Sequence, residues 1–203
     1  YREKKMPLWG ATDSDESKPK NLTTAQKKQV FANASGWVLE AGSALSGNDN
    51  TDADPEILVA IGELSTSIGA ADITEVEMVT TTADKSEGFT ISVRVRYNEP
   101  VDVVTTGGTP TLAVTNSNAG SGSGRGPHSL SYASGTGTNE LIFSLAIAAA
   151  NAATNADDVL TVGAQTIALN SGTIKDASGT ASDAALVISG AVGTAAGSVT
   201  VTA

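Results

Sequence analysis

The chain of 203 residues contains no cysteine and a single histidine, and aromatic residues make up only 4% of it. Without cysteine there are no disulfide bonds, no thiolate zinc sites and no cysteine nucleophile. One histidine excludes a metal site built from several histidines and leaves His128 as the one candidate base of a hydrolytic triad. No apolar run approaches the ~20 residues that a membrane-spanning helix needs. These absences predict a protein that is not an enzyme and binds no cofactor.

His128 itself lies in a glycine-rich segment, residues 123–129, which is typical of a flexible surface loop. A general base must be held in a fixed geometry next to its substrate. We therefore interpret His128 as an exposed loop residue rather than a catalytic one.

The residues that are present favour a folded chain built from small side chains. The sequence has 21 glycines, 40% hydrophobic residues and a mean hydropathy of -0.01. This composition is too apolar for a wholly disordered chain. The length fits one large all-β domain, or one domain with an additional segment.

Charge is unevenly distributed along the chain. Residues 1–28 hold seven basic and four acidic residues, whereas the other residues hold five basic and 18 acidic ones. The sequence thus predicts a basic N-terminal arm joined to a strongly acidic body. The acidic body would repel phosphates, and the few basic residues lack interleaved aromatic residues, so we expect no nucleic-acid partner.

The first 22 residues show no periodic pattern and predict an extended arm. No signal peptide is expected, because the residues after Lys5 lack an apolar core of ~7–15 residues, and Met6 is a plausible native start. Trp9 has no local core to join. It can either anchor the arm to a partner or fold back on its own domain.

Residues 23–34 predict a short helix. Thr23 is a suitable N-cap, strong helix formers follow it, and Gly36 is suited to the end of the helix. A helix of this length is marginal in isolation, so Val30 and Phe31 must dock on something. The short apolar run at residues 37–39 is interpreted as a strand.

Residues 40–55 predict an acidic, solvated linker. Asp49, Asp52 and Asp54 resemble a calcium loop, but the central glycine is missing and Pro55 interrupts the pattern. A second set of calcium ligands is conceivable between the loops of a β domain, from Asp157, Asp158 and Asp176. A solvated loop is the alternative reading in both places.

From residue 57 onward the pattern becomes that of a β protein. Residues 57–61 predict a buried strand, and apolar and polar side chains alternate over residues 89–97, as expected of a sheet with one face on a core. Further strands are predicted at residues 73–78, 101–104, 111–115, 129–132, 141–147, 159–162, 166–169 and 185–188. Residues 146–153 can form either a loop or a short helix.

These elements predict four regions. Residues 1–56 form an anchoring arm with a short helix and an acidic linker, residues 57–71 a connecting segment, and residues 72–190 an immunoglobulin-like antiparallel β-sandwich. Residues 191–203 form a strand-like tail beyond the sandwich. That tail either pairs with its own sheet or offers an edge to another subunit.

Part of the sandwich resembles the bacterial immunoglobulin-like repeats of large surface and adhesion proteins. The resemblance covers nearly half the chain and is carried by residues 98–101, 108–112, 132–138, 141–143 and 169–179. It implies a sandwich of about seven to nine strands that has no catalytic residues and acts as a spacer or display module.

The N-terminal third is similar to virion structural proteins of tailed phages that infect marine cyanobacteria and related bacteria. Residues 6–10, 17–20, 36–38 and 56–62 carry this similarity. The two resemblances together imply a capsid decoration protein, with an anchoring N-terminal region and an immunoglobulin-like domain that faces outward.

The sequence thus predicts a non-enzymatic virion protein on the outer surface of a capsid. Its expected partners are the major capsid protein or other virion proteins, without membrane or nucleic acid, and many copies on one shell, or a homo-oligomer, would bind multivalently. The expected partner-binding residues are Trp9, Lys18, Lys20, Lys27, Lys28, Val30, Phe31 and Trp37. The alternative is a carbohydrate- or host-surface-binding module on a phage tail, neck or fibre, with a site on the loop at residues 116–128.

Overall fold

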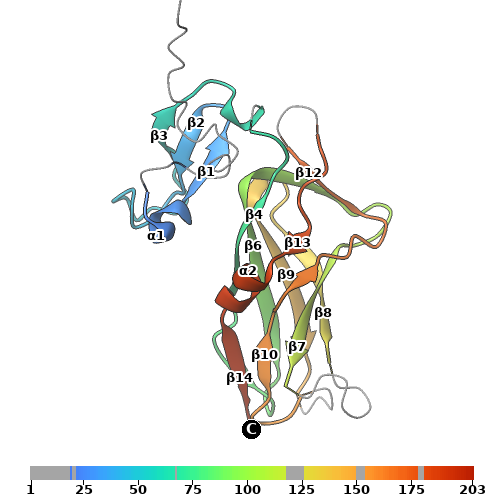
Figure 1. Cartoon of the computed structure of the whole chain (residues 1–203). Helices are drawn as coiled ribbons and strands as arrows, with labels where there is room; N and C mark the ends of the chain where they lie inside the picture. The colour runs from blue at the N-terminus through green and yellow to red at the C-terminus, as the bar shows by residue number, and fades with distance from the viewer. Residues whose placement is uncertain (1–18, 20–21, 67, 118–125, 150–153, 178–180) are drawn as a thin grey trace, which may run out of the picture.

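The computed structural model describes residue 19 and residues 22–66, 68–117, 126–149, 154–177 and 181–203 (Figure 1). Strands make up 47% of the structure and helices 8%, which confirms the expected all-β class. The chain forms a small N-terminal lobe, residues 22–68, and a β-sandwich, residues 71–203, each with its own hydrophobic core. Within these ranges no helix is long and apolar enough to cross a membrane.

The N-terminal lobe is a three-stranded antiparallel sheet, and not the extended arm and linker that the sequence predicted for this part of the chain. A single helical turn, α1 (Thr24–Lys27), leads into β1 (Val30–Asn33), β2 (Gly36–Leu39) and β3 (Glu56–Ala60), and η1 (Leu64–Thr66) follows. The lobe is built around six buried side chains: Val30, Ala32, Trp37, Leu39, Leu64 and Ile68. The expected division at residue 56 is therefore wrong, because β3 completes the sheet that β1 and β2 begin.

The helix predicted for residues 23–34 ends after its first turn. Thr23 caps it as expected, since the Gln26 backbone N donates to Thr23 Oγ1 and the Thr23 backbone N donates to Gln26 Oε1. Beyond Lys28 the prediction is wrong, because Val30 and Phe31 belong to strand β1. As part of a strand, Val30 is buried in the lobe core and Phe31 is buried at the boundary with the sandwich, which one isolated helix could not achieve.

Gly36 begins β2, directly after the β1–β2 turn at residues 34–35, and does not end a helix. Its φ is +136°, and a Cβ at this position would lie 2.0 Å from the backbone oxygen of Val59 in β3. The turn is closed by a hydrogen bond from the Ser35 backbone N to Asn33 Oδ1 (2.8 Å). Glycine is needed here because a neighbouring strand approaches the backbone closely.

The sandwich contains the remaining strands and a second short helix. They are β4 (Ile73–Met78), β5 (Ala83–Asp84), β6 (Phe89–Val104), β7 (Thr111–Asn116), β8 (His128–Ser134), β9 (Thr138–Ile147), β10 (Val159–Thr161), β11 (Gln165–Thr166), β12 (Thr173–Asp176), β13 (Val187–Ile188), α2 (Gly190–Ala195) and β14 (Ser198–Thr202). One long sheet curls through the order β12-β6-β9-β8-β7-β10-β14-β5, and β4 pairs with β6.

This strand order is that of an immunoglobulin-like sandwich. The first strand of the sandwich is divided into two short strands, β4 and β5, which pair with different partners. β4 pairs antiparallel with β6, and β5 pairs parallel with β14. Strands β4, β6, β9 and β8 form one half of the curled sheet, and β7, β10, β14 and β5 form the other half, which is joined to the first by the β8–β7 pairing. The pattern corresponds to strands A, B, E and D packed on C, F and G.

The alternation at residues 89–97 is confirmed by burial in β6. Ile91, Val93, Val95 and Tyr97 are fully buried, and Tyr97 Oη donates to the backbone oxygen of Ala185 (3.1 Å). The strand predicted separately at residues 101–104 is the second half of β6, which continues through an irregularity between Arg96 and Val101. One bent strand therefore contacts β4, β9 and β12 in turn.

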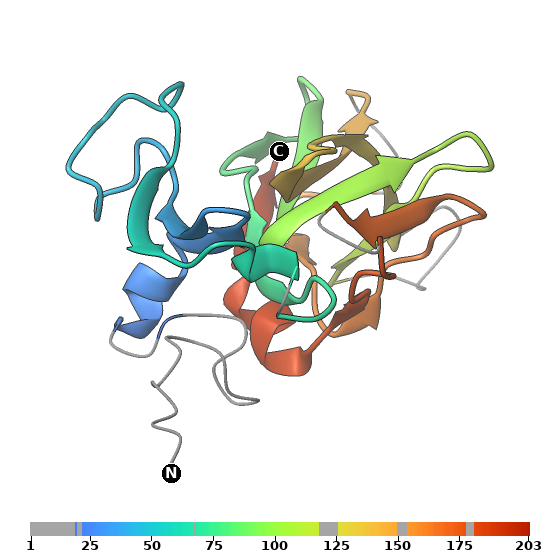
Figure 2. The ribbon, with the colours of Figure 1, turned by 90° about the horizontal axis from the view of Figure 1, so that it is seen from above.

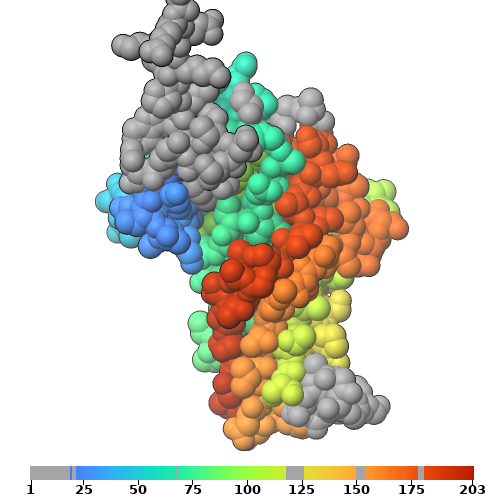
Figure 3. Space-filling model, in the orientation of Figure 1, coloured from blue at the N-terminus to red at the C-terminus, as the bar shows by residue number. Residues whose placement is uncertain are grey.

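The C-terminal strand belongs to the sandwich and is not a tail beyond it. β14 lies between β10 and β5, and Val199 and Val201 are buried in the core. The space-filling view shows the red C-terminal segment lying against orange β10 (Figure 3). The expected domain end at residue 190 is therefore wrong, and of the two alternatives for the tail the structure has the first, pairing with its own sheet.

Candidate functional site

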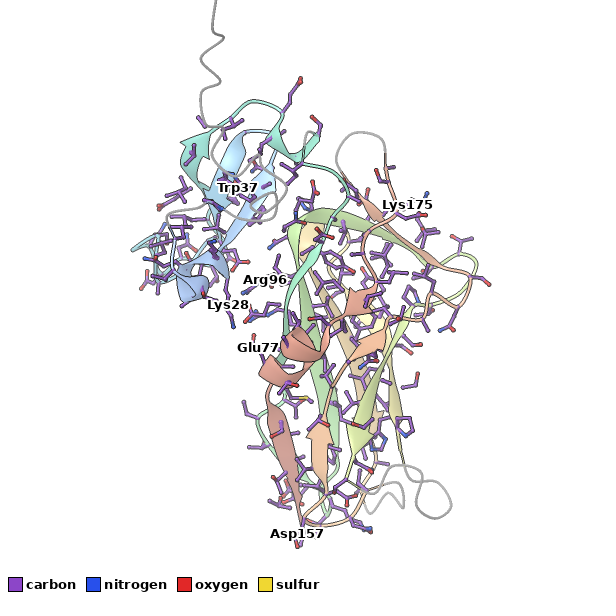
Figure 4. All side chains as sticks on the ribbon, in the orientation of Figure 1. Lys28, Trp37, Glu77, Arg96, Asp157 and Lys175 are labelled. Atoms are coloured by element: carbon purple, nitrogen blue, oxygen red, sulfur yellow. The ribbon has the colours of Figure 1, made fainter. Side chains whose placement is uncertain are left out.

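The expected partner-binding residues fall into three groups. Trp9, Lys18 and Lys20 lie outside the described residues. Val30, Phe31 and Trp37 are buried against their own chain, so the expectation that they contact a partner is wrong. Val30 and Trp37 belong to the lobe core, where Figure 4 labels Trp37, and Phe31 lines the boundary between the lobe and the sandwich. Lys27 and Lys28 remain partly exposed.

Lys28 lies at the junction between the lobe and the sandwich. Its Nζ forms an ion pair with Glu75 Oε1 of β4 at 2.6 Å, and its backbone oxygen accepts a hydrogen bond from Arg96 Nη1 at 2.9 Å. The residue thus joins the end of the single helical turn to two strands of the sandwich.

Arg96 of β6 is the centre of this junction. Its side chain is 9% exposed. The guanidinium contacts three carboxylates: Nε is 3.0 Å from Glu40 Oε1, Nη1 donates to Glu75 Oε2 at 2.7 Å, and both Nε and Nη2 donate to Glu140 Oε1. Glu40 comes from the lobe and the other two carboxylates come from the sandwich, so one buried cation holds both parts together.

The charges around Arg96 compensate for its burial. Burial by itself lowers the pKa of the guanidinium, but the negative charges of Glu40, Glu140 and Glu75 outweigh it and raise the pKa above its ordinary value. Asn139 Nδ2 also donates to Glu40 Oε1 at 3.1 Å, and Arg94 pairs with Glu77 and lies 3.5 Å from Glu140. The junction is a connected network and not a single ion pair.

Sequence reasoning did not identify this junction. Arg94 and Arg96 occupy polar positions of the alternation over residues 89–97, which predicts that they lie on the side of the sheet away from the core. That pattern gives the side of the sheet correctly. It contains no signal that β1 and Lys28 cover part of the same face.

Two grooves flank the junction. The larger one, of about 600 Å³, is lined by both parts of the protein, including Phe31, Glu40, Thr51, Arg94 and Asn139. The smaller one, of about 430 Å³, lies between α1 and the sandwich and is lined by Lys27, Lys28, Ile73 and Val187, among others. Both are open grooves of mixed polarity along the boundary between lobe and sandwich.

His128 is buried, which corrects its interpretation as an exposed loop residue. It begins β8, its side chain is 5% exposed, and Nε2 has no hydrogen-bond partner in the described structure. Burial lowers the pKa of His128, and the charge of Asp158 partly opposes this effect. An imidazole that is enclosed in this way is not accessible to a substrate as a general base.

The buried His128 predicts a pH dependence of stability. An unfolded histidine has a pKa near 6.5 and the folded pKa is lower, so below this pH the unfolded state binds more protons. The free energy of unfolding should then fall as the pH falls through and below 6.5, by at most about 1.4 kcal/mol per pH unit from this group. Urea titrations of the wild type and of His128→Gln should lose stability at different rates below pH 6.5. Parallel curves would contradict the assignment, because the carboxylates titrate in both proteins.

The candidate calcium ligands are not brought together. In the described ranges no three side chains of His, Asp or Glu form a group that could hold a metal ion. Asp157 lies at the end of the sandwich near the C-terminus, whereas Lys175, which precedes Asp176, lies at the other end (Figure 4). Asp49, Asp52 and Asp54 are exposed in the loop before β3.

The loop at residues 116–128, predicted as a carbohydrate-binding site in the alternative hypothesis, lies mostly outside the described residues, because the structure does not describe residues 118–125.

Comparison with known proteins finds no matching family, no similar curated protein and no similar solved structure.

Proposed function

We propose that this chain is a non-enzymatic virion protein of a tailed phage that binds the outer surface of the capsid through its N-terminal region and displays an immunoglobulin-like sandwich. The resemblances of the N-terminal third and of residues 98–188 motivate the proposal. The arrangement of the two parts of the molecule supports it.

The observation that carries the proposal is the fixed position of the N-terminal lobe. The buried Arg96 network attaches the lobe beside one end of the elongated sandwich, and the C-terminus lies at the opposite end (Figure 1). A protein held at its N-terminal end would therefore project its sandwich away from the surface that binds it. An arrangement with one attached end and one free end suits an anchored display module.

The shell contact is assigned to the basic segment that precedes the lobe. Because Val30, Phe31 and Trp37 are buried, the residues left from the expected set are Trp9, Lys18, Lys20 and Lys27, with Lys28 engaged by Glu75. Basic side chains and one aromatic residue suit an acidic capsid surface. Repetition of this contact over a shell would make modest individual affinities sufficient.

Charge reversal in the basic segment tests the proposal. Lys18→Glu/Lys20→Glu should weaken cosedimentation with capsids of the encoding phage, prepared without this protein, by about tenfold at low salt. The matched control is Lys85→Glu/Lys175→Glu, which makes the same change of net charge on the sandwich and should alter binding by less than about twofold.

Two results would contradict the proposal. The first is a wild-type chain that does not sediment with capsids under any salt condition. The second is equal loss of binding in both double variants, which would mean that net charge and not the N-terminal segment determines the interaction.

A further inference from the structure

The outer edge of the N-terminal lobe exposes two consecutive apolar side chains. Strand β3 lies at one edge of the lobe sheet, on the side facing away from the sandwich, whereas β1 at the opposite edge lies against β6 (Figures 1 and 2). Ile57 is 58% exposed and Leu58 is 37% exposed. The sequence predicted a buried strand here, and that expectation is wrong for these two positions.

A β-bulge explains why neighbouring residues are both exposed. Trp37 pairs with Val59 and Val38 pairs with Ile57, so Leu58 is an extra residue in β3. The bulge interrupts the alternation of the strand. Val59 and Ile61 still pack against the lobe core, while Ile57 and Leu58 together form an apolar surface in solvent. We call this pair the β3 apolar pair.

Acidic side chains surround the β3 apolar pair in the sequence. No lysine or arginine occurs from residue 29 to residue 84, so the lobe after Lys28 contains neither. Asp49, Asp52, Asp54 and Glu56 precede the pair directly, and all four are exposed. Exposed apolar side chains that directly follow several exposed carboxylates in the chain suit a partner that is basic around an apolar residue.

The same charges argue against a second copy of this chain as the occupant. Contact between two β3 strands would bring two sets of these carboxylates to one interface, and like charges at an interface disfavour the pairing. A partner segment that alternates basic and apolar residues meets no such repulsion.

We propose that the β3 apolar pair and the exposed acidic residues just before it, Asp52, Asp54 and Glu56, bind a basic, apolar segment of the shell protein. This inference rests on the proposed function and deepens it, because it adds a second contact of opposite sign to the basic segment before the lobe. The N-terminal region would then bind the shell through two contacts, one made by basic residues and one made by the acidic edge of the lobe.

The test compares two double variants of the full chain. Ile57→Ser/Leu58→Ser removes the β3 apolar pair, and Val79→Ser/Val104→Ser removes two side chains of similar exposure, 45% and 51%, from the sandwich. Capsid cosedimentation should be at least about tenfold weaker for the first variant and change less than about twofold for the second. Urea midpoints close to that of the wild type show that both variants are folded.

A peptide probe tests the surface without the capsid. A short synthetic peptide that alternates lysine with valine should shift the amide resonances of β3 in the full chain. A peptide that alternates glutamate with valine should not, and neither should the lysine peptide with Ile57→Ser/Leu58→Ser.

The outcomes separate this inference from the proposed function. If the chain binds capsids but the β3 variant binds equally well, the inference is wrong and the proposed function stands. If no variant binds capsids, both are wrong, and the peptide result still reports the chemistry of the edge. Protection of the β3 amides from hydrogen exchange that rises with protein concentration would identify a second copy as the occupant. Loss of this protection on deleting residues 1–18 would identify the chain's own N-terminus as the occupant. Either result would overturn the assignment to the shell protein.

Discussion

In urea titrations, Val201→Asp is expected to lower the free energy of unfolding of the sandwich by about 4 kcal/mol or more. Val201 is fully buried in β14, a strand hydrogen-bonded on both sides by β10 and β5. A carboxylate at this position would lie in the core without a cation to pair with it. A loss of this size is a large fraction of the 5–15 kcal/mol that stabilises a typical domain.

The matched control for this prediction is the neighbouring residue. Thr200 lies on the same strand but is exposed, so Thr200→Asp should change the free energy of unfolding by about 1 kcal/mol or less. Similar midpoints for the two variants would mean that residues 198–202 are a tail beyond the domain, and that β14 does not form part of the sandwich in solution.

Replacing the buried arginine at the junction is expected to loosen the N-terminal lobe. Arg96→Met keeps much of the side-chain volume but leaves Glu40, Glu75 and Glu140 facing one another without their shared cation. Removing one partner from a buried ionic network costs about 3 kcal/mol or more. Amide hydrogen exchange should therefore become faster in β1 and β2, while the core strands of the sandwich keep their protection.

Arg94→Met provides the comparison for this experiment. Arg94 is 30% exposed and contacts Glu77 and Glu140, but it makes no contact with the lobe carboxylate Glu40 in the described network. Its replacement should cost about 1 kcal/mol or less and leave exchange in the lobe close to wild type. Equal acceleration in both variants would show that the general charge of this face, and not the Arg96 contacts, holds the lobe.

Local patterns predicted the sandwich well because the relevant signal lies within single strands. In β6 the alternation of apolar and polar residues over 89–97 indicates which side chains face the core. Ile91, Val93, Val95 and Tyr97, at the apolar positions, are fully buried. The turns and short strands from β7 to β10 were placed by the same reasoning. The β14 segment was recognised as a strand, but its membership of the sheet depends on pairing with residues 83–84 and 159–161, far away in the sequence.

The N-terminal lobe was predicted poorly because its local and long-range preferences differ. The capping residues around Thr23 favour a helix and do form one turn, yet pairing with β2 and β3 turns the following residues into a strand. The sequence places Trp37 only in a short apolar run within an anchoring arm, and it gives no indication that this part of the chain has a core of its own. That core exists only once η1 and Ile68 fold back onto the sheet.

The sequence alone determined the all-β class, the immunoglobulin-like sandwich and the separation of a basic N-terminal segment from an acidic body. These properties follow from composition and from periodicities of a few residues. Tertiary structure decided which side chains remain available for binding: it buried Trp37 and His128, placed Arg96 among three carboxylates, and left Ile57 and Leu58 in solvent. The physical reason is that burial and ion pairing depend on which segments, distant in the sequence, come into contact. A local sequence pattern does not predict those contacts.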